Sequence, residues 1–318
     1  MNRDLRSIAA IALLAGCAAL AAEEKGVYLF CFFRDNGQDG LYLCWSPDGY
    51  RWTELTPPGK TFLKPEVGGK LMRDPCIVRG PDGTFHMVWT TGWNKPPVAG
   101  YARSKDLRSW SSQTELPVMA GEPEARNVWA PELFYNRSAK TWLLFWSTTI
   151  PGRFTETALS GDNEYNHRIY CTTTTDFGSY TPTRLFYDGG FNVIDATILQ
   201  ARGSFHLIVK DETKRPLKKH LRIATSLDAA GPYGPAGPSF TLDWVEGPSA
   251  LRIGDEYFVY FDHYAKPQYY GAVKSRDLKQ WEDVSARMSF PAGMRHGTAL
   301  RIPGSVARKL GAGLEARK

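Results

Sequence analysis

Cysteine is scarce in this sequence, and helical patterning is almost absent. The five cysteines in 318 residues form no CxxC pair and no Cys/His spacing typical of zinc, which argues against a tight zinc site. No nucleotide-binding loop, haem motif or amphipathic helical stretch of useful length occurs. The net charge of +6 is mild for this length. No basic run interleaves with aromatic residues, so a nucleic-acid groove is not indicated.

The N-terminus predicts export. Residues 1–22 combine Arg3 and Arg6 with an apolar stretch and small residues, as a secretion signal does. The segment ending at Cys17 (LAGC) also resembles the bacterial lipobox, whose cysteine is lipidated and anchors the protein to a membrane; ordinary cleavage after residue 21 or 22 is the alternative. Either interpretation predicts a secreted, periplasmic or lipid-anchored protein of a bacterial cell envelope. At the other end, residues 306–318 are expected to be a loosely ordered basic tail.

Aromatic residues are abundant, at 13% with ten Trp, and they mark a repeat. This surplus suits packed β-structure or a surface that stacks on sugars. Five segments combine Ser or Thr with an Asp that can bond nearby backbone N–H groups, and each ends in an aromatic residue: SPDGYRW (46–52), SKDLRSW (104–110), TTDFGSY (174–180), TSLDAAGPY (225–233) and SRDLKQW (275–281).

Two further series of short runs predict strands, because the runs are β-branched or aromatic and too short for helices. The aromatic series comprises GVYLFCFF (26–33), GTFHMVWT (83–90), KTWLLFWS (140–147), GSFHLIVK (203–210) and DEYFVYFD (255–262). The series that precedes it comprises RDPCIVRG (73–80), WAPELFYN (129–136), IDATILQA (194–201), EGPSALRI (246–253) and RHGTALRI (295–302).

Five such units predict an all-β fold, a five-bladed β-propeller over residues 23–305. The last unit is split between the two ends of the chain. Its first strand is RHGTALRI, and residues 26–52 supply the others. The N-terminal strands are therefore expected to complete the C-terminal blade, which closes the ring without a bare sheet edge.

The first strand of each propeller blade lines the central channel, so the residues that open these strands should converge. Asp74, Asp195, Glu246 and His296 are predicted to occupy nearly equivalent places there. The Gly-Pro pair after Glu246 is expected to end strand pairing and to leave that acid free to aim inward. Glu132 lies two places further along its strand, so it is expected to point elsewhere.

The segments RDP, WAPE, IDA, EGP and RHG, in this order on five blades, resemble glycoside hydrolase family 43, in its arabinofuranosidase and xylosidase branch. The resemblance implies that Asp74 is the general base, Asp195 the acid that tunes the proton donor, and Glu246 the general acid. It also implies that His296 helps to hold a hydrated calcium ion, with no organic cofactor. One departure is Ala196, where the family often has Pro.

The chemistry of inversion asks for the same residue types. One carboxylic acid protonates the leaving oxygen while a carboxylate, roughly 6.5–9.5 Å away, activates water on the opposite face of the sugar. Glu246 must therefore stay protonated near neutral pH while Asp74 stays ionised. The charge of a neighbouring Asp195 is expected to raise the pKa of Glu246.

Other side chains are predicted to contact the sugar. Trp93 and Trp129 are chosen for stacking, and Arg295 for its place beside the acids. His167 and His263 are further candidates for contact with the sugar, and a structural role in the scaffold is equally open for both. The further candidates for contact with sugar hydroxyls are Asn127, Arg153 and Lys210.

These observations predict an exo-acting, inverting glycosidase that removes terminal L-arabinofuranose or D-xylose from plant polysaccharides or oligosaccharides. A β-galactofuranosidase or an endo-arabinanase of the same fold remains open. A sialidase is disfavoured, because no arginine cluster with a Tyr nucleophile is found. A surface propeller that binds glycans without cleaving them is the alternative from another class. The expected partner is carbohydrate, with the membrane reached only through a lipidated Cys17.

Overall fold

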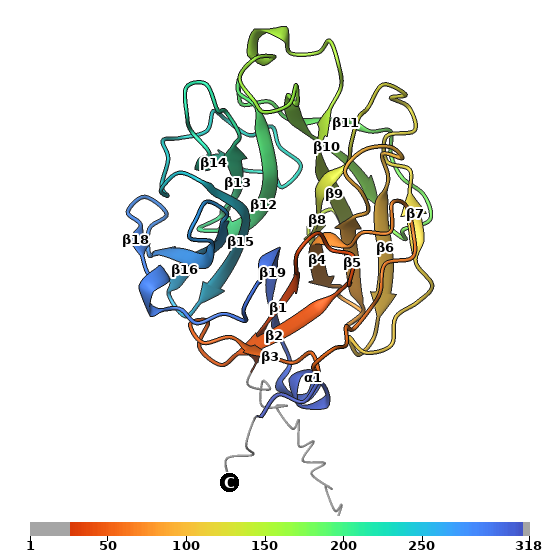
Figure 1. The fold of residues 1–318 in the computed structure, drawn as a ribbon, viewed down its shortest axis with the longest axis vertical. Coiled ribbons are helices and arrows are strands. Elements are labelled where there is room, and N and C mark those ends of the chain that lie inside the picture. The colour runs from red at the N-terminus through yellow and green to blue at the C-terminus, as the bar shows by residue number, and fades with distance from the viewer. Residues whose placement is uncertain (1–25, 314–318) are drawn as a thin grey trace, which may run out of the picture.

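The repeat in the sequence becomes a ring of five small antiparallel sheets in the computed structural model, which describes residues 26–313 (Figure 1). The signal segment, its Cys17 and the last five residues lie outside the described residues. Each sheet begins with a strand at the centre of the ring and proceeds outward through hairpins. The prediction of a five-bladed propeller is confirmed.

The first two blades each have four strands. Their bounds are β4 (Arg73–Arg79), β5 (Phe85–Thr90), β6 (Ala99–Ser104) and β7 (Thr114–Leu116), then β8 (Trp129–Asn136), β9 (Thr141–Thr149), β10 (His167–Thr174) and β11 (Arg184–Tyr187), with the 3-10 helix η1 (Thr155–Thr157) between β9 and β10.

The third blade has three strands and the fourth has four. These are β12 (Val193–Ala201), β13 (Ser204–Asp211) and β14 (His220–Ser226), followed by β15 (Val245–Ile253), β16 (Glu256–His263), β17 (Tyr269–Ser275) and β18 (Glu282–Asp283), after which comes η2 (Ser285–Arg287).

The fifth blade joins the two ends of the chain, as predicted. Its innermost strand is β19 (Arg295–Ile302), which pairs with β1 (Val27–Phe33); β2 (Tyr42–Ser46) and β3 (Thr53–Glu54) follow outward. This closure gives the fifth blade the same order of strands, from the centre outward, as the other blades.

The Asp turns hold the outer hairpins as the sequence predicts. In SPDGYRW, Asp48 Oδ1 accepts hydrogen bonds from the backbone N–H groups of Tyr50 and Arg51, and Ser46 Oγ accepts from Gly49. The carboxylates of the other turns make the same type of bond one or more times; they are Asp106, Asp176, Asp228 and Asp277.

Aromatic side chains pack between neighbouring blades. Between the fourth and fifth blades, Phe30 meets Trp52, Tyr260 and Tyr270 edge to face, with ring centroids 5.1–5.6 Å apart. Such pairs add about 0.5–1.5 kcal/mol each to the burial of their area. The four cysteines of the described chain are free and buried, so here they act as small core residues.

The C-terminal segment is more ordered than predicted. Residues 304–309 form the short helix α1 (Gly304–Lys309), and Ala307, Leu310 and Ala312 join the core cluster between the fifth and first blades. Their apolar side chains are the reason that this segment docks. Within residues 26–313, no helix is long and apolar enough to span a membrane.

Candidate active site

Every innermost strand carries the same irregularity near its start. In each blade, two residues that are three positions apart on the innermost strand pair with two residues that are only two positions apart on the neighbouring strand. The extra residue on the innermost strand forms a β-bulge. For example, Arg73 and Cys76 pair with Thr90 and Val88. The equivalent bulges begin at Trp129, Ile194, Glu246 and Arg295.

The bulges place the backbone of the second residue in the left-handed region in four blades. The φ values are 50° at Asp74, 45° at Ala130, 51° at Asp195 and 59° at Gly247. Left-handed backbone is uncommon for residues with a Cβ, although Asp tolerates it better than most. The chain therefore maintains a strained geometry at the mouth of the channel, and strain of this kind concentrates at functional sites.

This register corrects the sequence analysis in two respects. Asp74, Asp195 and His296 hold the second place of their bulges, but Glu246 holds the first, so the four residues are not all equivalent. Strand pairing also does not end at Gly247 and the proline after it, because β15 continues on both sides of the bulge. The bulge, which leaves a residue out of the ladder, is what tolerates a Pro inside this strand.

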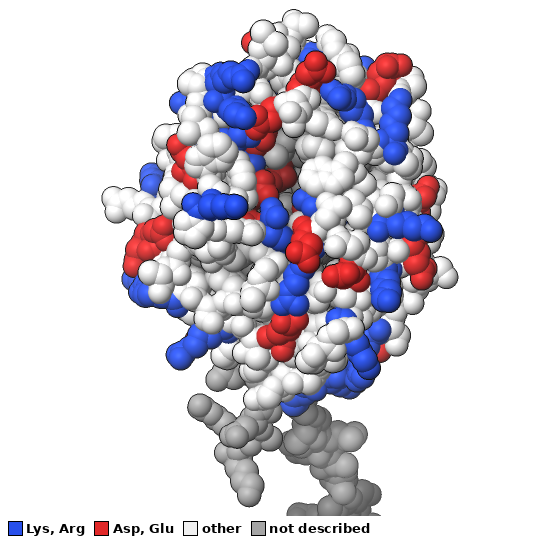
Figure 2. Space-filling model, in the orientation of Figure 1, with Lys and Arg blue, Asp and Glu red and all other residues white. Residues whose placement is uncertain are grey.

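Most of the first and second bulge residues line one cavity of about 380 Å³. Figure 2 shows acidic and basic side chains gathered around a hollow near the middle of the face in view. Three blades thus bring the three predicted acids to the same cavity, whose lining is Asp35, Asn36, Arg73, Asp74, Thr90, Trp93, Trp129, Ile194, Asp195, Glu212, Glu246, Arg295 and His296.

Asp74 lies in an environment that keeps it ionised. Its Oδ1 is 3.3 Å from His296 Nδ1, and its Oδ2 accepts a hydrogen bond of 2.7 Å from the Thr90 hydroxyl. Burial alone would raise the pKa of Asp74, but the bond to His296, that residue's charge, Arg73 and Thr90 together lower it to about 2. Burial would likewise lower the pKa of His296, yet Asp74 and the other nearby acids raise it to about 9.

Glu246 is held between two cations. Lys210 Nζ is 3.0 Å from one of its carboxylate oxygens, and Arg295 Nη2 is 3.1 Å from the other. Burial raises the pKa of Glu246, but the charges of Lys210 and Arg295 outweigh it and lower that pKa. In the free protein these two cations therefore favour the ionised form of Glu246, whereas the sequence analysis expected the protonated form, because the sequence did not show that Lys210 and Arg295 reach the same carboxylate.

Asp195 has the opposite shift. Its Oδ2 accepts a bond of 3.0 Å from the Gly247 N–H, and its own N–H donates to Ser147 Oγ at 3.1 Å. Burial and the charge of Glu246 raise the pKa of Asp195 to about 6, against the lowering effect of His296 and Lys210. In the free protein Asp195 therefore holds a proton more readily than Glu246 does.

Two tryptophans form an aromatic wall of the cavity, as predicted. Trp93 is 46% exposed, and its indole N–H donates to Asn36 Oδ1 at 2.9 Å. The Arg73 guanidinium lies 4.2 Å from its ring centroid. Trp129 donates to the Trp93 carbonyl at 2.9 Å, and the two rings meet edge to face. The exposed face of Trp93 is thereby fixed in orientation and available to a ligand.

Two predicted contact residues serve the scaffold instead. Asn127 is fully buried, and its side chain bonds to the backbone at both ends of Ser147–Thr149. Arg153 lies away from the cavity in a two-pronged ion pair with Glu122. The predictions for both were wrong, because a polar side chain near the channel mouth can equally satisfy a loop.

The two histidines with open assignments also lie outside the cavity lining. His167 is 1% exposed, packs 4.9 Å from the Trp129 ring and has a pKa lowered by burial to about 3. His263 stacks on Tyr269 at 4.4 Å. Both therefore follow the scaffold alternative. Lys210, at 1% exposure, reaches Glu246 and Glu212 rather than open space.

Sequence reasoning missed some of the lining. Glu212 is 2.6 Å from Lys210 Nζ and also pairs with the buried Lys219. The pairing of the two strands could have indicated Glu212. Lys210 pairs with Ile194, the neighbour of Asp195, so Glu212, two residues after Lys210, lies at the same end of the sheet as the cavity. Thr90 could have been found in the same way, as the partner of Arg73.

A second set of polar side chains forms hydrogen bonds between blades. Each of them lies three residues after the first residue of its bulge. Glu132 accepts hydrogen bonds from Thr197 at 3.2 Å and Thr298 at 3.0 Å. It is buried, and burial raises its pKa to about 7 against the lowering effect of His296. Glu132 thus points inward, contrary to the expectation from its offset, but it does not line the cavity.

The residues around His296 do not fit a protein-ligated calcium ion. Calcium takes six to eight oxygen ligands, whereas His296 offers nitrogen, and its Nδ1 already contacts Asp74. Nowhere in residues 26–313 do three His, Cys, Asp or Glu side chains form a group that could hold a metal. The hydrated calcium ion that the family resemblance implies stays a prediction, and the reaction proposed below does not rely on it.

Comparison with known proteins agrees with this architecture. A family model for a probable glycosyl hydrolase domain, related to glycosyl hydrolase family 43, matches residues 23–305. An α-L-arabinofuranosidase of Bifidobacterium longum is 23% identical over 167 residues, which cover 46% of this chain but only 15% of that protein.

Solved structures share the fold at low identity. The α-L-arabinofuranosidase from Lactobacillus brevis is 17% identical, with 69% of this chain and 73% of that one covered at a TM-score of 0.51. A family 43 β-1,3-galactosidase solved with galactodeoxynojirimycin is 13% identical, with 82% and 90% covered at a TM-score of 0.57.

Proposed function

The chain belongs to the family of probable glycosyl hydrolase domains related to family 43, and from that premise we propose that it is an exo-acting, inverting glycoside hydrolase that works outside the cytoplasm. One observation carries the proposal: Asp74, Asp195 and Glu246, from three different blades, line a single cavity. A glycan-binding propeller without activity has no need for three acids in one cavity, of which Asp74 and Glu246 have lowered pKa values and Asp195 a raised one.

In the proposed reaction Asp74 is the base. It accepts a proton from a water molecule whose oxygen attacks the anomeric carbon, while the bond from that carbon to the leaving oxygen breaks. The leaving oxygen takes its proton from Glu246. Asp74 suits its role because its pKa of about 2 keeps it ionised over the whole neutral range.

Glu246 must gain a proton before it can act, and the structure suggests how this is achieved. A bound sugar excludes water from the cavity, which strengthens the burial effect that raises the pKa of Glu246. Lys210 has a second partner, since Glu212 lies only 2.6 Å from its Nζ. A shift of Lys210 toward Glu212 would weaken one of the contacts that keep Glu246 ionised.

The size of the cavity supports removal of one terminal sugar. Its volume of about 380 Å³ is near the lower end of the range for small-molecule sites, roughly 300–1,000 Å³. We propose L-arabinofuranose as the first candidate and D-xylose as the second, in keeping with the arabinofuranosidase relatives. A terminal β-1,3-linked galactose is the alternative that the comparison favours, because the galactosidase structure aligns over 82% of this chain.

The test is release of nitrophenol from a panel of nitrophenyl arabinofuranoside, xyloside, galactofuranoside and galactoside. We expect one sugar to be released and expect Glu246→Gln and Asp74→Asn each to lower kcat/KM by about 10²–10⁴-fold. Glu156→Gln is the control, because Glu156 is an exposed acid whose carboxylate instead pairs with Arg168. NMR of the first-formed anomer checks inversion.

Two outcomes would overturn the proposal. If both active-site variants are as fast as the parent, the three acids are not catalytic. If the parent binds glycans in equilibrium measurements but releases no sugar from any of them, the protein is a binding propeller.

A further inference from the structure

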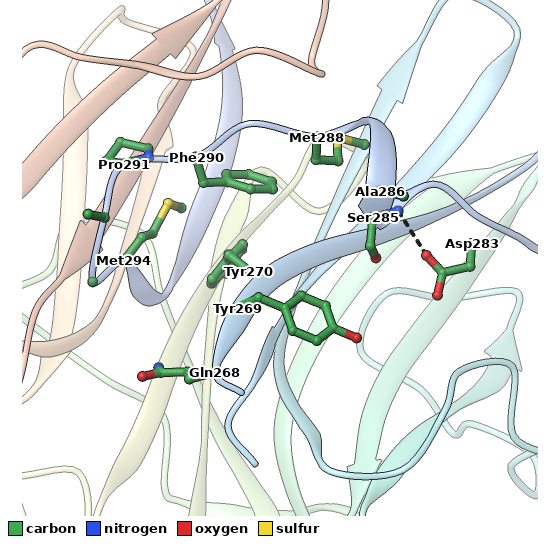
Figure 3. A pocket seen from close by; sticks show the side chains of 12 residues that line it. Gln268, Tyr269, Tyr270, Asp283, Ser285, Ala286, Met288, Phe290, Pro291 and Met294 are labelled. Carbon is green, nitrogen blue, oxygen red and sulfur yellow. Dashed lines mark hydrogen bonds between the residues drawn. The ribbon is translucent and has the colours of Figure 1, made fainter. Parts of the chain in front are cut away.

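A large groove lies between the third strand of the fourth blade and the segment that leads into the fifth blade, and none of its lining residues lines the active-site cavity. Three segments form it: Gln268 with the first two residues of β17, residues 283–288 with η2, and residues 290–294, which lead into β19. Figure 3 shows their side chains facing one space. We call it the β17 groove. Its volume is about 730 Å³, roughly twice that of the cavity between the acids.

We propose that the β17 groove is a second binding site, which holds the leaving-group portion of a neutral glycan while its terminal sugar occupies the active-site cavity. The proposal rests on the hydrolase function proposed above. The new element is that the β17 groove lets the protein distinguish a polymeric substrate from a small glycoside.

The lining chemistry fits an uncharged sugar chain. Tyr269 is 36% exposed, and Phe290 lies across the groove from it (Figure 3). Flat apolar rings of this kind suit the C–H faces of sugars, while Gln268 and Asp283 supply polar groups for hydroxyls. Because no Lys, Arg or His contributes to the lining, an anionic ligand finds no counter-charge there.

The groove is pre-formed. Tyr270 and Phe290 pack with ring centroids 5.1 Å apart, and Met294 beside them is 3% exposed. Tyr269 itself stacks on His263 at 4.4 Å. A ligand therefore meets side chains that are already held in place, which reduces the entropy lost on binding.

A chain of hydrogen bonds connects the groove to the proton donor. Gln268, in the groove, donates to Asp262 Oδ1 at 3.2 Å. The other oxygen of Asp262 accepts from Arg295, whose Nη2 is 3.1 Å from Glu246. In sequence, Met294 of the groove directly precedes Arg295 of the cavity. The two hollows thus share a wall, and a glycan that leaves the cavity on this side reaches the groove.

The experiment compares two substrates with the same terminal sugar, the nitrophenyl glycoside that the parent cleaves and a polysaccharide that carries the sugar at its ends, such as arabinan for arabinose. For Tyr269→Ala we expect the ratio of kcat/KM on the polymer to kcat/KM on the nitrophenyl glycoside to fall about 3- to 10-fold, as the loss of an aromatic contact predicts. Tyr269→Phe keeps the ring and should restore the ratio.

Tyr180→Ala is the matched control. Tyr180 lines a separate cavity of about 380 Å³ formed by residues 116–122 and 172–183, and its loss should leave the ratio unchanged. The proposal is overturned if Tyr269→Ala also leaves the ratio unchanged, or if it lowers both rates equally, which indicates a structural effect on the acids.

Failure of the hydrolase proposal can be told apart from failure of this one. If the parent cleaves no substrate of the panel, affinity electrophoresis through gels that contain arabinan, xylan or β-1,3-galactan tests the groove alone. Retardation of the parent that Tyr269→Ala weakens and Tyr180→Ala does not would support the groove as a glycan site. Equal mobility of all three proteins in every gel would exclude it.

Discussion

Gly247 provides a test of the bulge geometry with an internal reference. Its φ is +59°, and a Cβ added there would lie 2.3 Å from the His296 ring, closer than real atoms approach. Gly254, in the hairpin between β15 and β16, has the same φ of +59° but nothing within 4 Å of a Cβ. Alanine at either position bears the same backbone penalty, and only Gly247→Ala adds a collision with the His296 ring.

The expected magnitudes follow from these two contributions. Gly254→Ala should lower the free energy of unfolding by about 1–2 kcal/mol, the cost of a left-handed alanine. Gly247→Ala should lower it by about 1–3 kcal/mol more, as overpacking does. Because the displaced His296 contacts the carboxylate of Asp74, Gly247→Ala should also reduce kcat/KM, by about 10²-fold as small misplacements at active sites do.

Urea unfolding and steady-state kinetics on both variants provide the measurement. The two glycines share a strand and its hairpin, so general damage to β15 would affect both proteins alike. Equal destabilisation of the two variants, with equal activity, would refute the claim that Gly247 is required by contact with His296.

Two further predictions concern buried charges. Lys210→Met removes a cation 3.0 Å from Glu246, so the pKa of Glu246 should rise and the high-pH limb of the kcat/KM profile should move to higher pH. A limb that stays in place would show that Glu246 is not the proton donor or that Lys210 does not act on it. Glu132→Gln tests linkage: because burial raises the pKa of Glu132 from 4.5 to about 7, the native state keeps a proton that the unfolded state releases, and this stabilisation is lost as pH rises from 4.5 through 7. Urea unfolding at pH 5 and 8 should therefore show the variant gaining about 3 kcal/mol relative to the parent between the two pH values, and parallel curves would contradict the assignment.

The fold was predictable because its signals are local and repeated. Each Asp turn needs only a few neighbouring residues, such as Ser46 with Asp48, and the same chemistry recurs in every blade. Closure of the ring was predictable because the last repeat unit has only its first strand, at residues 295–302, whereas the N-terminus has the outer strands of a unit without a first strand. These strands form one sheet. The docking of α1 was missed because three apolar residues among charged ones give a weak pattern.

The site was predictable in its acids but not in their partners. Asp74 and Asp195 stand out in the sequence because an acid at the start of an apolar strand is unusual. The cations around Glu246 come from β13 and β19, and only the packing of neighbouring blades shows that Lys210 and Arg295 reach the same carboxylate. Register across a bulge is likewise not visible in a sequence, so Glu246 was placed one residue from its true position.

The two aspartates show why register determines the chemistry. Asp74 and Asp195 have the same side chain, the same bulge position and nearly the same φ, yet burial acts on both and their pKa values shift in opposite directions. The difference lies in the blade beside each. His296 of the fifth blade contacts the carboxylate of Asp74 directly, whereas at Asp195 burial and the charge of Glu246 from the fourth blade outweigh the lowering effect of His296 and Lys210. The same bulge therefore holds an ionised carboxylate at one position and an acid with a raised pKa at another, because the charged groups of the neighbouring blades differ.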